Sequence, residues 1–244
     1  MTCWNTRKLG GMKIVTLRSI SAIGLRELGE MISPTDYGNY PHKWKWDPPG
    51  PWTEVIATEI EKLSPLGCLG FCCICANRVL PDYLRHLYAN RILPDYLQDQ
   101  SVDNRPLLAL EMSKKVAGGN GAAVSIVECK ELVDCLYDMN AAPYSTKWQS
   151  ALLDIYVTAE TTLLILGKFF DEAMANGGQL ADRANNSPRE QAYQLESIKL
   201  LKELSPRGSS VPFGNPVTVD DVQSELKRLG WHDDPWIDGH TMPD

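Results

Sequence analysis

The sequence predicts an all-α protein, a multi-helix bundle with an irregular, aromatic and proline-rich N-terminal strap and an irregular C-terminal tail. Three observations support this fold class. Apolar residues recur at three- and four-residue steps, helix-start and helix-stop residues separate these runs, and strand-like alternation is almost absent. With 244 residues, 43% of them apolar and 23% charged, the chain can bury a core without disulfide bonds.

The chain divides by composition into three parts, an N-terminal segment with the strap (1–52), a helical domain (53–204) and a connector with a short helix and an acidic tail (205–244). The first thirty residues are ambiguous, because Ile14 and Val15 suit either a strand or the first turn of a helix. Translation from Met12 would leave the preceding residues as a disordered leader.

The strap is expected from five prolines and two glycines between Ser33 and Trp52, which exclude a regular element there. Its aromatic side chains suit either of two roles, packing over the helical body or forming a contact surface for another protein. Together with two tryptophans of the tail, they are the candidate partner-binding residues: Tyr37, Tyr40, Trp44, Trp46, Trp52, Trp231 and Trp236.

The first helices of the bundle are expected on both sides of Pro65. A helix begins with Thr53 as its N-cap and ends or kinks at this proline. The next segment, residues 66–79, is apolar nearly all round, which predicts a buried central helix.

Five further helices follow from periodicity and from their start and stop residues. Asp103-Asn104-Arg105-Pro106 starts one helix, which Gly118-Gly119-Asn120-Gly121 ends, and Asn176-Gly177-Gly178 ends another. The five predicted helical runs are residues 107–116, 122–139, 145–175, 187–204 and 218–229.

A tandem duplication lies in the middle of the chain. Residues 76–84 recur as residues 89–97, and only Val79 and Ile92 differ. Thirteen residues separate the copies, so both could not face one core on a single helix, and Pro81 and Pro94 are expected to break that helix. The duplication therefore predicts a lengthened helix end and loop, with a binding role of its own as the alternative.

Four of the seven cysteines gather between residues 68 and 75, and they suit either a metal site or core packing. A zinc site needs two separated pairs of ligands, and only His86, Cys129 and Cys135 are available as distant partners. On a helix, Cys68, Cys72 and Cys75 would share one face, as buried apolar residues do. The sequence therefore favours core packing and predicts no metal site.

Other candidate sites carry weak signals. His232 and His240 lie among aspartates that could bind a cation, but a solvated or packed tail is favoured. Arg78, Arg91 and Arg105 could bind an anion, although ion pairs with Asp82, Asp95 or Asp103 are the expected outcome. The glycines at 118–121 lack the lysine of a phosphate-binding loop, and no nucleophile motif is visible. No catalytic residue and no cofactor are predicted.

The charge of −7 is unevenly distributed, because residues 1–52 carry +3 and the remainder carries −10. An acidic body disfavours nucleic acid and favours solubility or a basic protein partner. The chain has no apolar stretch near the twenty residues of a membrane span. An odd cysteine count without a signal segment predicts a cytoplasmic protein with free thiols.

A partial resemblance covers residues 66–139. The run Cys73-x-x-Ala76-Asn77-Arg78-Val79-Leu80-Pro81, followed by Asp103-Asn104-Arg105-Pro106-Leu107-Leu108-Ala109-Leu110-Glu111, resembles a helical family of immunity proteins from bacterial polymorphic-toxin systems. Phe213-Gly214-Asn215-Pro216 resembles a segment of helical proteins from planctomycete-type bacteria. The immunity family acts by binding, so the resemblance implies no catalytic residues.

Three functional hypotheses follow. The first is a non-enzymatic protein-binding protein, an immunity protein that neutralises a toxin by occlusion. The second is a structural accessory subunit of a larger complex, docked by the strap and the tail. The third and weakest is a helical metal-dependent hydrolase that would use Glu111, His86, His232 or His240. The sequence does not set the oligomeric state.

Overall fold

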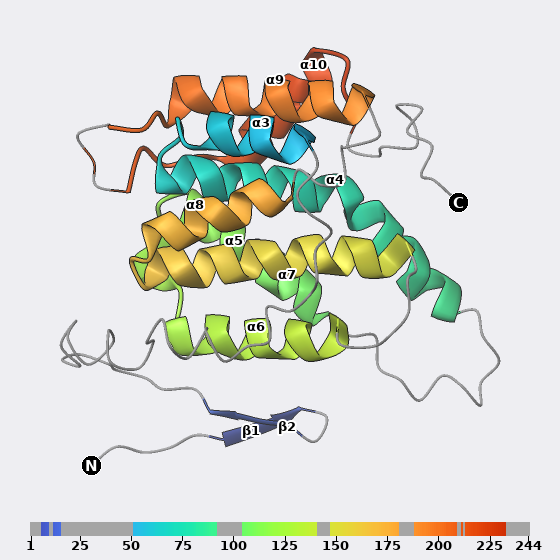
Figure 1. The fold of residues 1–244 in the computed structure, drawn as a ribbon. Helices are drawn as coiled ribbons and strands as arrows, with labels where there is room; N and C mark the ends of the chain where they lie inside the picture. Colours follow the sequence, from blue (N-terminus) through green and yellow to red (C-terminus); the bar gives the residue numbers. More distant parts are fainter. Residues whose placement is uncertain are drawn as a thin grey trace. The chain divides into compact units, whose positions relative to one another are not determined.

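In the computed structural model, the described residues are 6–9, 12–15, 51–91, 104–140, 147–180, 188–208, 211 and 213–232. The chain forms two compact units, Met1–Lys45 and Trp46–Asp244. The described part of the second unit consists of α-helices and one 3-10 turn joined by loops, which confirms the predicted all-α bundle (Figure 1). The strap lies largely outside the described residues.

The described part of the first unit is a β-hairpin. Strand β1 (Thr6–Leu9) pairs antiparallel with β2 (Met12–Val15), with Thr6 opposite Val15 and Leu9 opposite Met12. The strand reading of Ile14 and Val15 is therefore the correct one. The expectation of a disordered leader over residues 1–11 is wrong for Thr6–Leu9, because these residues form β1 and pair with β2.

The first two helices of the bundle meet at a corner before Pro65. Helix α3 (Pro51–Ile60) begins two residues before the expected N-cap Thr53, and α4 (Pro65–Arg91) is longer than expected. Pro81 lies inside α4, so the prediction that the prolines break this helix is wrong for the first copy of the duplication. Figure 1 shows α4 bending in its second half, the usual effect of an internal proline. Pro94 lies outside the described residues.

The middle of the bundle contains α5 (Arg105–Ala117), a 3-10 turn η2 (Gly121–Ala123) and α6 (Ile126–Asn140). Helix α6 starts four residues later than the predicted run at 122, after the short turn. The Ser125 hydroxyl accepts a hydrogen bond from the Glu128 amide at 3.3 Å, so Ser125 caps the helix.

The predicted helix at 145–175 is two helices, α7 (Lys147–Leu166) and α8 (Phe170–Gln179). The chain turns at Lys168, whose φ of 67° is left-handed. Gly177 does not end the run as expected but lies inside α8. A side chain there would reach 2.5 Å from the Cys68 sulfur, so glycine lets α8 pack closely on α4.

The last helices are α9 (Pro188–Leu204) and α10 (Val219–Arg228), close to their predicted bounds. The apolar side of α10 belongs to the core, because Val219, Val222 and Leu226 are buried. The segment after Ser205 is thus packed against the helical body. The end of the tail, from Asp233, lies outside the described residues.

Helices α4 and α7 form the centre of the bundle. Helix α7 contacts α4, α5, α6 and α8, and it is buried along almost all of Ala151–Ile165. Buried hydroxyls on α7 donate hydrogen bonds to backbone carbonyls one turn earlier in the helix. The Thr158 hydroxyl, for example, donates to the Asp154 carbonyl at 2.7 Å. Helix α6 lies at one edge and contacts only α5 and α7 among the described helices to a substantial extent (Figure 1).

Candidate functional site

The predicted partner-binding aromatics fall mostly outside the described residues. This holds for Tyr37, Tyr40, Trp44, Trp46 and Trp236, and for the side chain of Trp52 in α3. Their role stays a prediction. Trp231 is described and is partly buried, with its ring against that of Tyr193 at 5.7 Å and 75°.

Trp231 belongs to a cluster around Arg78, a fully buried arginine of α4. The Arg78 Nε donates to the Glu190 carboxylate of α9 at 2.8 Å, and the guanidinium lies 3.9 Å from the Tyr193 ring centre. Arg78 Nη1 also donates to the His232 carbonyl. The expected partner was one of Asp82, Asp95 and Asp103, so the sequence did not predict this ion pair. The cluster joins α4, α9 and the start of the tail, and its burial suits a structural role.

The cysteines of α4 pack in the core, as predicted. Cys68, Cys72, Cys73 and Cys75 are buried, and the cysteines in the described part of the chain are free thiols. A hydrogen bond with Cys72 and burial raise the pKa of the Cys68 thiol well above its ordinary value, and burial does the same for the pKa of Cys73. Such thiols are poor nucleophiles at neutral pH.

The residues of the metal hypothesis are not brought together where the structure describes them. Glu111 is exposed on α5 and lies 3.3 Å from the Lys114 ammonium, whereas His232 follows α10 beside Arg78. Among the described residues, no group of three His, Cys, Asp or Glu side chains could hold a metal ion. The side chain of His86 and all of His240 lie outside the described residues.

The helix ends meet around Phe213-Gly214-Asn215-Pro216. A relay of hydrogen bonds runs from the Gly67 amide to Ser64 Oγ (3.1 Å), from Ser64 Oγ to Ser205 Oγ (2.6 Å) and from there to the Asn215 carbonyl (2.6 Å). This segment therefore fastens the ends of α3, α4 and α9 to one another.

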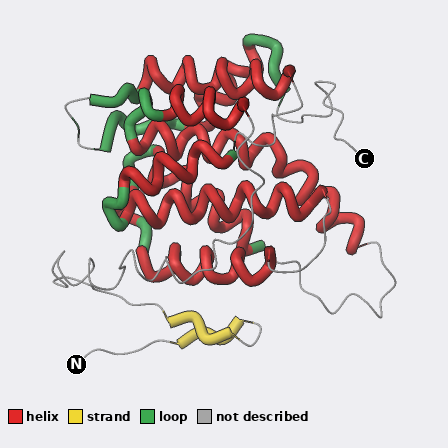
Figure 2. Tube along the Cα trace, in the orientation of Figure 1, coloured by secondary structure: helices red, strands yellow, loops and turns green. Residues whose placement is uncertain are grey.

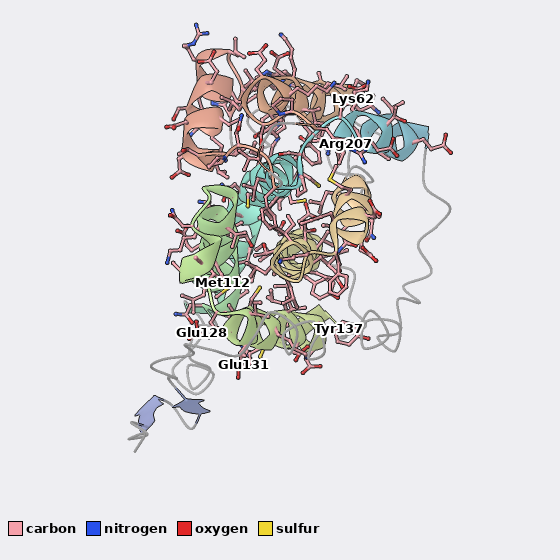
Figure 3. The ribbon with its side chains drawn as sticks, turned by 90° about the vertical axis from the view of Figure 1, so that its left-hand side faces the viewer. Lys62, Met112, Glu128, Glu131, Tyr137 and Arg207 are labelled. Carbon is pink, nitrogen blue, oxygen red and sulfur yellow. The ribbon has the colours of Figure 1, made fainter. Side chains whose placement is uncertain are left out.

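Two hollows border this segment, and Val211 and Gly214 belong to the walls of both. One, of about 330 Å³, has only apolar side chains and glycines in its wall. The other, of about 300 Å³, also contains Arg207, Asp171 and Ser64. Figure 3 shows Arg207 beside Lys62, and the Arg207 amide donates to the Lys62 carbonyl at 2.9 Å. The two hollows therefore differ in the polarity and charge of the side chains in their walls.

The outer face of α6 carries several exposed carboxylates. We call it the acidic α6 face and define it by the exposed residues Glu128, Glu131 and Asp138. Figure 3 shows Glu128 and Glu131 on the side of α6 away from the bundle. The helix carries four acidic residues and one lysine, which pairs with Asp134 at 2.7 Å.

The acidic α6 face is not neutralised within the described chain. No ion pair among the described residues involves Glu128, Glu131 or Asp138. Sequence reasoning noted an acidic body but missed this face. Its signal was present, because Glu131, Asp134 and Asp138 recur at three- and four-residue steps within a predicted helix.

Comparison of the chain with protein-family models, with curated proteins and with solved structures finds no significant match. The resemblance to helical immunity proteins therefore stays a prediction. In the described residues, none of the helices combines the length and the hydropathy that a membrane crossing requires.

Proposed function

We propose that this chain is a non-enzymatic binding protein whose acidic α6 face receives a basic protein, as an immunity protein does when it occludes a toxin. The observation that carries the proposal is the exposure of Glu128, Glu131 and Asp138 on one side of an edge helix without an ion pair in the described structure. A solvated acidic face speeds the encounter with a basic surface and leaves its charges available for pairing.

The surroundings of this face support binding by a rigid surface. Cys129, Val133 and Leu136 on the opposite side of α6 are buried against the bundle. Val127, which is 41% exposed, adds an apolar contact beside Glu131, four residues further along the helix. A partner would therefore meet one apolar contact and several carboxylates on a fixed helix, which resembles the mixed chemistry of ordinary interfaces.

The test is an affinity capture with the tagged chain from its native lysate at low and at physiological salt, followed by a binding measurement with the purified partner. The triple variant Glu128→Gln, Glu131→Gln, Asp138→Asn should bind a basic partner roughly tenfold more weakly, since three exposed charges contribute about 0.5 kcal/mol each. The effect should shrink at high salt, because exposed charges are screened.

A matched control changes the same number of charges elsewhere. Glu54, Glu61 and Glu203 are exposed on α3, after α3 and on α9. The variant Glu54→Gln, Glu61→Gln, Glu203→Gln should retain normal affinity. Equal weakening by both triple variants would indicate a net-charge effect and would contradict the assignment to α6. Turnover of a substrate by the purified chain would contradict the non-enzymatic proposal as a whole.

The accessory-subunit hypothesis remains the alternative. A truncation that tests it must keep α10, because residues of this helix belong to the core. Removal of all residues from Val211 would strip Val217, Val219 and Val222 from the core, so that truncation would unfold the body rather than report on docking. Truncation after His232 leaves the contacts of Trp231 and His232 in place. Under this alternative, the shorter truncation should prevent assembly while the helical body stays folded.

A further inference from the structure

The apolar hollow at the end of the bundle is assembled from segments far apart in the chain. Its wall contains residues of α4, the end of α5, η2, the end of α7 and the segment from Val211 to Pro216. Figure 2 shows loops of the bundle gathered at the end where these segments meet. The lining residues are Leu66, Val116, Gly119, Gly121, Ala122, Ile165, Leu166, Val211, Phe213, Gly214 and Pro216.

The hollow has a buried floor and an accessible apolar rim. Val116 and Ile165 of the floor are each 2% exposed, whereas Val211 on the rim is 43% exposed. Ala122 on the rim is also exposed. A ligand could therefore enter from solvent and still cover side chains of the core.

The walls are held apart by fixed backbone. Gly119 and Gly214 have left-handed φ values of 81° and 90°, which a glycine adopts without strain. A Cβ at Gly119 would lie 2.8 Å from Pro216 Cγ, and one at Gly214 would overlap Ser64. The Val217 amide donates to the Ala117 carbonyl at 2.8 Å, which ties the last wall to α5. The hollow is thus preformed rather than created by a ligand.

The lining decides the chemistry of the ligand. None of these described side chains is charged or can form a hydrogen bond, so an ionised group in the hollow would lose water without gaining a side-chain partner or a counter-charge. An apolar cavity of about 150 Å³ is large enough to bind benzene. At about 330 Å³, this hollow suits a larger ligand, such as a fused aromatic ring system or a short branched hydrocarbon.

We propose that this hollow is a binding site for a small, uncharged, apolar ligand. The site is separate from the acidic α6 face, and it does not depend on the proposed function. The second hollow, which shares Val211 and Gly214 with this one, is excluded from the proposal, because Arg207 and Asp171 contribute charge to its wall.

The test uses the full chain and the neutral fluorescent probe N-phenyl-1-naphthylamine. We expect saturable, one-to-one binding and an increase of the melting temperature with the probe. A Cβ at Gly121 would lie 3.5 Å from Leu166 and 3.9 Å from Val116, two lining residues, and its backbone is not left-handed. Gly121→Leu should therefore fill the hollow without a clash at its Cβ and weaken probe binding at least tenfold.

Two variants complete the design. Ala123→Leu places the same side chain two residues further along, at an exposed residue outside the lining, and should leave probe binding unchanged. Ala122→Trp, at the exposed rim, should obstruct entry and serves if Gly121→Leu fails to fold. The triple variant of the acidic α6 face should bind the probe normally, which separates the failure of this proposal from the failure of the proposed function.

Three results would overturn the proposal. The first is the absence of saturable probe binding to the native chain. The second is an unchanged dissociation constant in folded Gly121→Leu or Ala122→Trp, which would place the probe elsewhere. The third is equal or tighter binding of the anionic probe 8-anilinonaphthalene-1-sulfonate at the same site, which would contradict a preference for uncharged ligands.

Discussion

Helices α4 and α6 both contain cysteines and apolar residues, but the bundle uses them differently. From Leu66 to Val79, the residues of α4 are buried on all sides, because α5, α7, α8, α9 and α10 pack around the helix. Helix α6 buries one stripe and leaves the acidic α6 face in solvent. Helix α4 is apolar nearly all round and has neighbouring helices on every side, so it maintains the fold, whereas the amphipathic α6 has neighbours on one side and can present a surface.

The largest losses of stability are expected from substitutions of groups that face α4, because this helix is buried on all sides. Glu190→Ala leaves the fully buried Arg78 without the carboxylate 2.8 Å away and should lower the free energy of unfolding by about 3–5 kcal/mol. Urea denaturation followed by circular dichroism measures this loss. The double variant Arg78→Met, Glu190→Leu removes both charges and should be much less destabilised. A loss below about 1 kcal/mol in Glu190→Ala would show that the pair is dispensable.

A second prediction concerns the buried thiol on the inner side of α6. Burial raises the pKa of Cys129 to about 12. A group whose pKa is higher in the folded state stabilises the fold fully below its unfolded pKa, and that contribution declines as pH rises toward the folded value. From an unfolded pKa near 8.5–9, this thiol alone should remove about 1.5 kcal/mol from the free energy of unfolding by pH 10.

Denaturation in urea at pH 7 and pH 10, under reducing conditions, measures this change. The Cys129→Ala variant is less stable at pH 7, because the substitution leaves a cavity in the core. It should nevertheless lose less stability than the native chain on going to pH 10. The raised pKa values of Cys68 and Cys73 in α4 act in the same direction and remain in the variant. An identical pH dependence for variant and native chain would contradict the role assigned to Cys129.

The sequence predicted what depends on local pattern and missed what depends on distant partners. The bounds of α9 and the end of α5 at Gly118 agree closely with predictions from start and stop residues. The break at Lys168 was missed, because Leu163, Leu166 and Phe170 keep a helical spacing across it. Pro81 was misread because packing of α4 on its neighbours outweighs the local penalty of a proline within a helix.

The two candidate sites differ in the same way. The acidic α6 face could have been read from the spacing of its carboxylates within one predicted helix. The apolar hollow could not, because Leu66, Val116 and Phe213 come together only through tertiary packing. The ion pair between Arg78 and Glu190 could not be predicted from the sequence for the same reason, because the two residues are 112 positions apart.

The smallest expected effect on stability lies on the acidic α6 face. Glu128 and Glu131 are three residues apart and carry like charges, so each slightly destabilises α6 through the other. Glu131→Gln should therefore change the free energy of unfolding by no more than about 0.5 kcal/mol, in the stabilising direction. Its contribution to binding should be lost at the same time.

Chemical denaturation of Glu131→Gln and of the native chain measures the change in the free energy of unfolding. The affinity of both for a captured basic partner measures the contribution to binding. The matched control is Asp134→Asn, which breaks the pair with Lys130 and should cost a few tenths of a kcal/mol. Destabilisation of Glu131→Gln by more than about 1 kcal/mol would mean that the outer side of α6 maintains the fold as α4 does. A residue of a binding surface is expected to behave differently, because its carboxylate lowers the stability of its own helix but strengthens the complex.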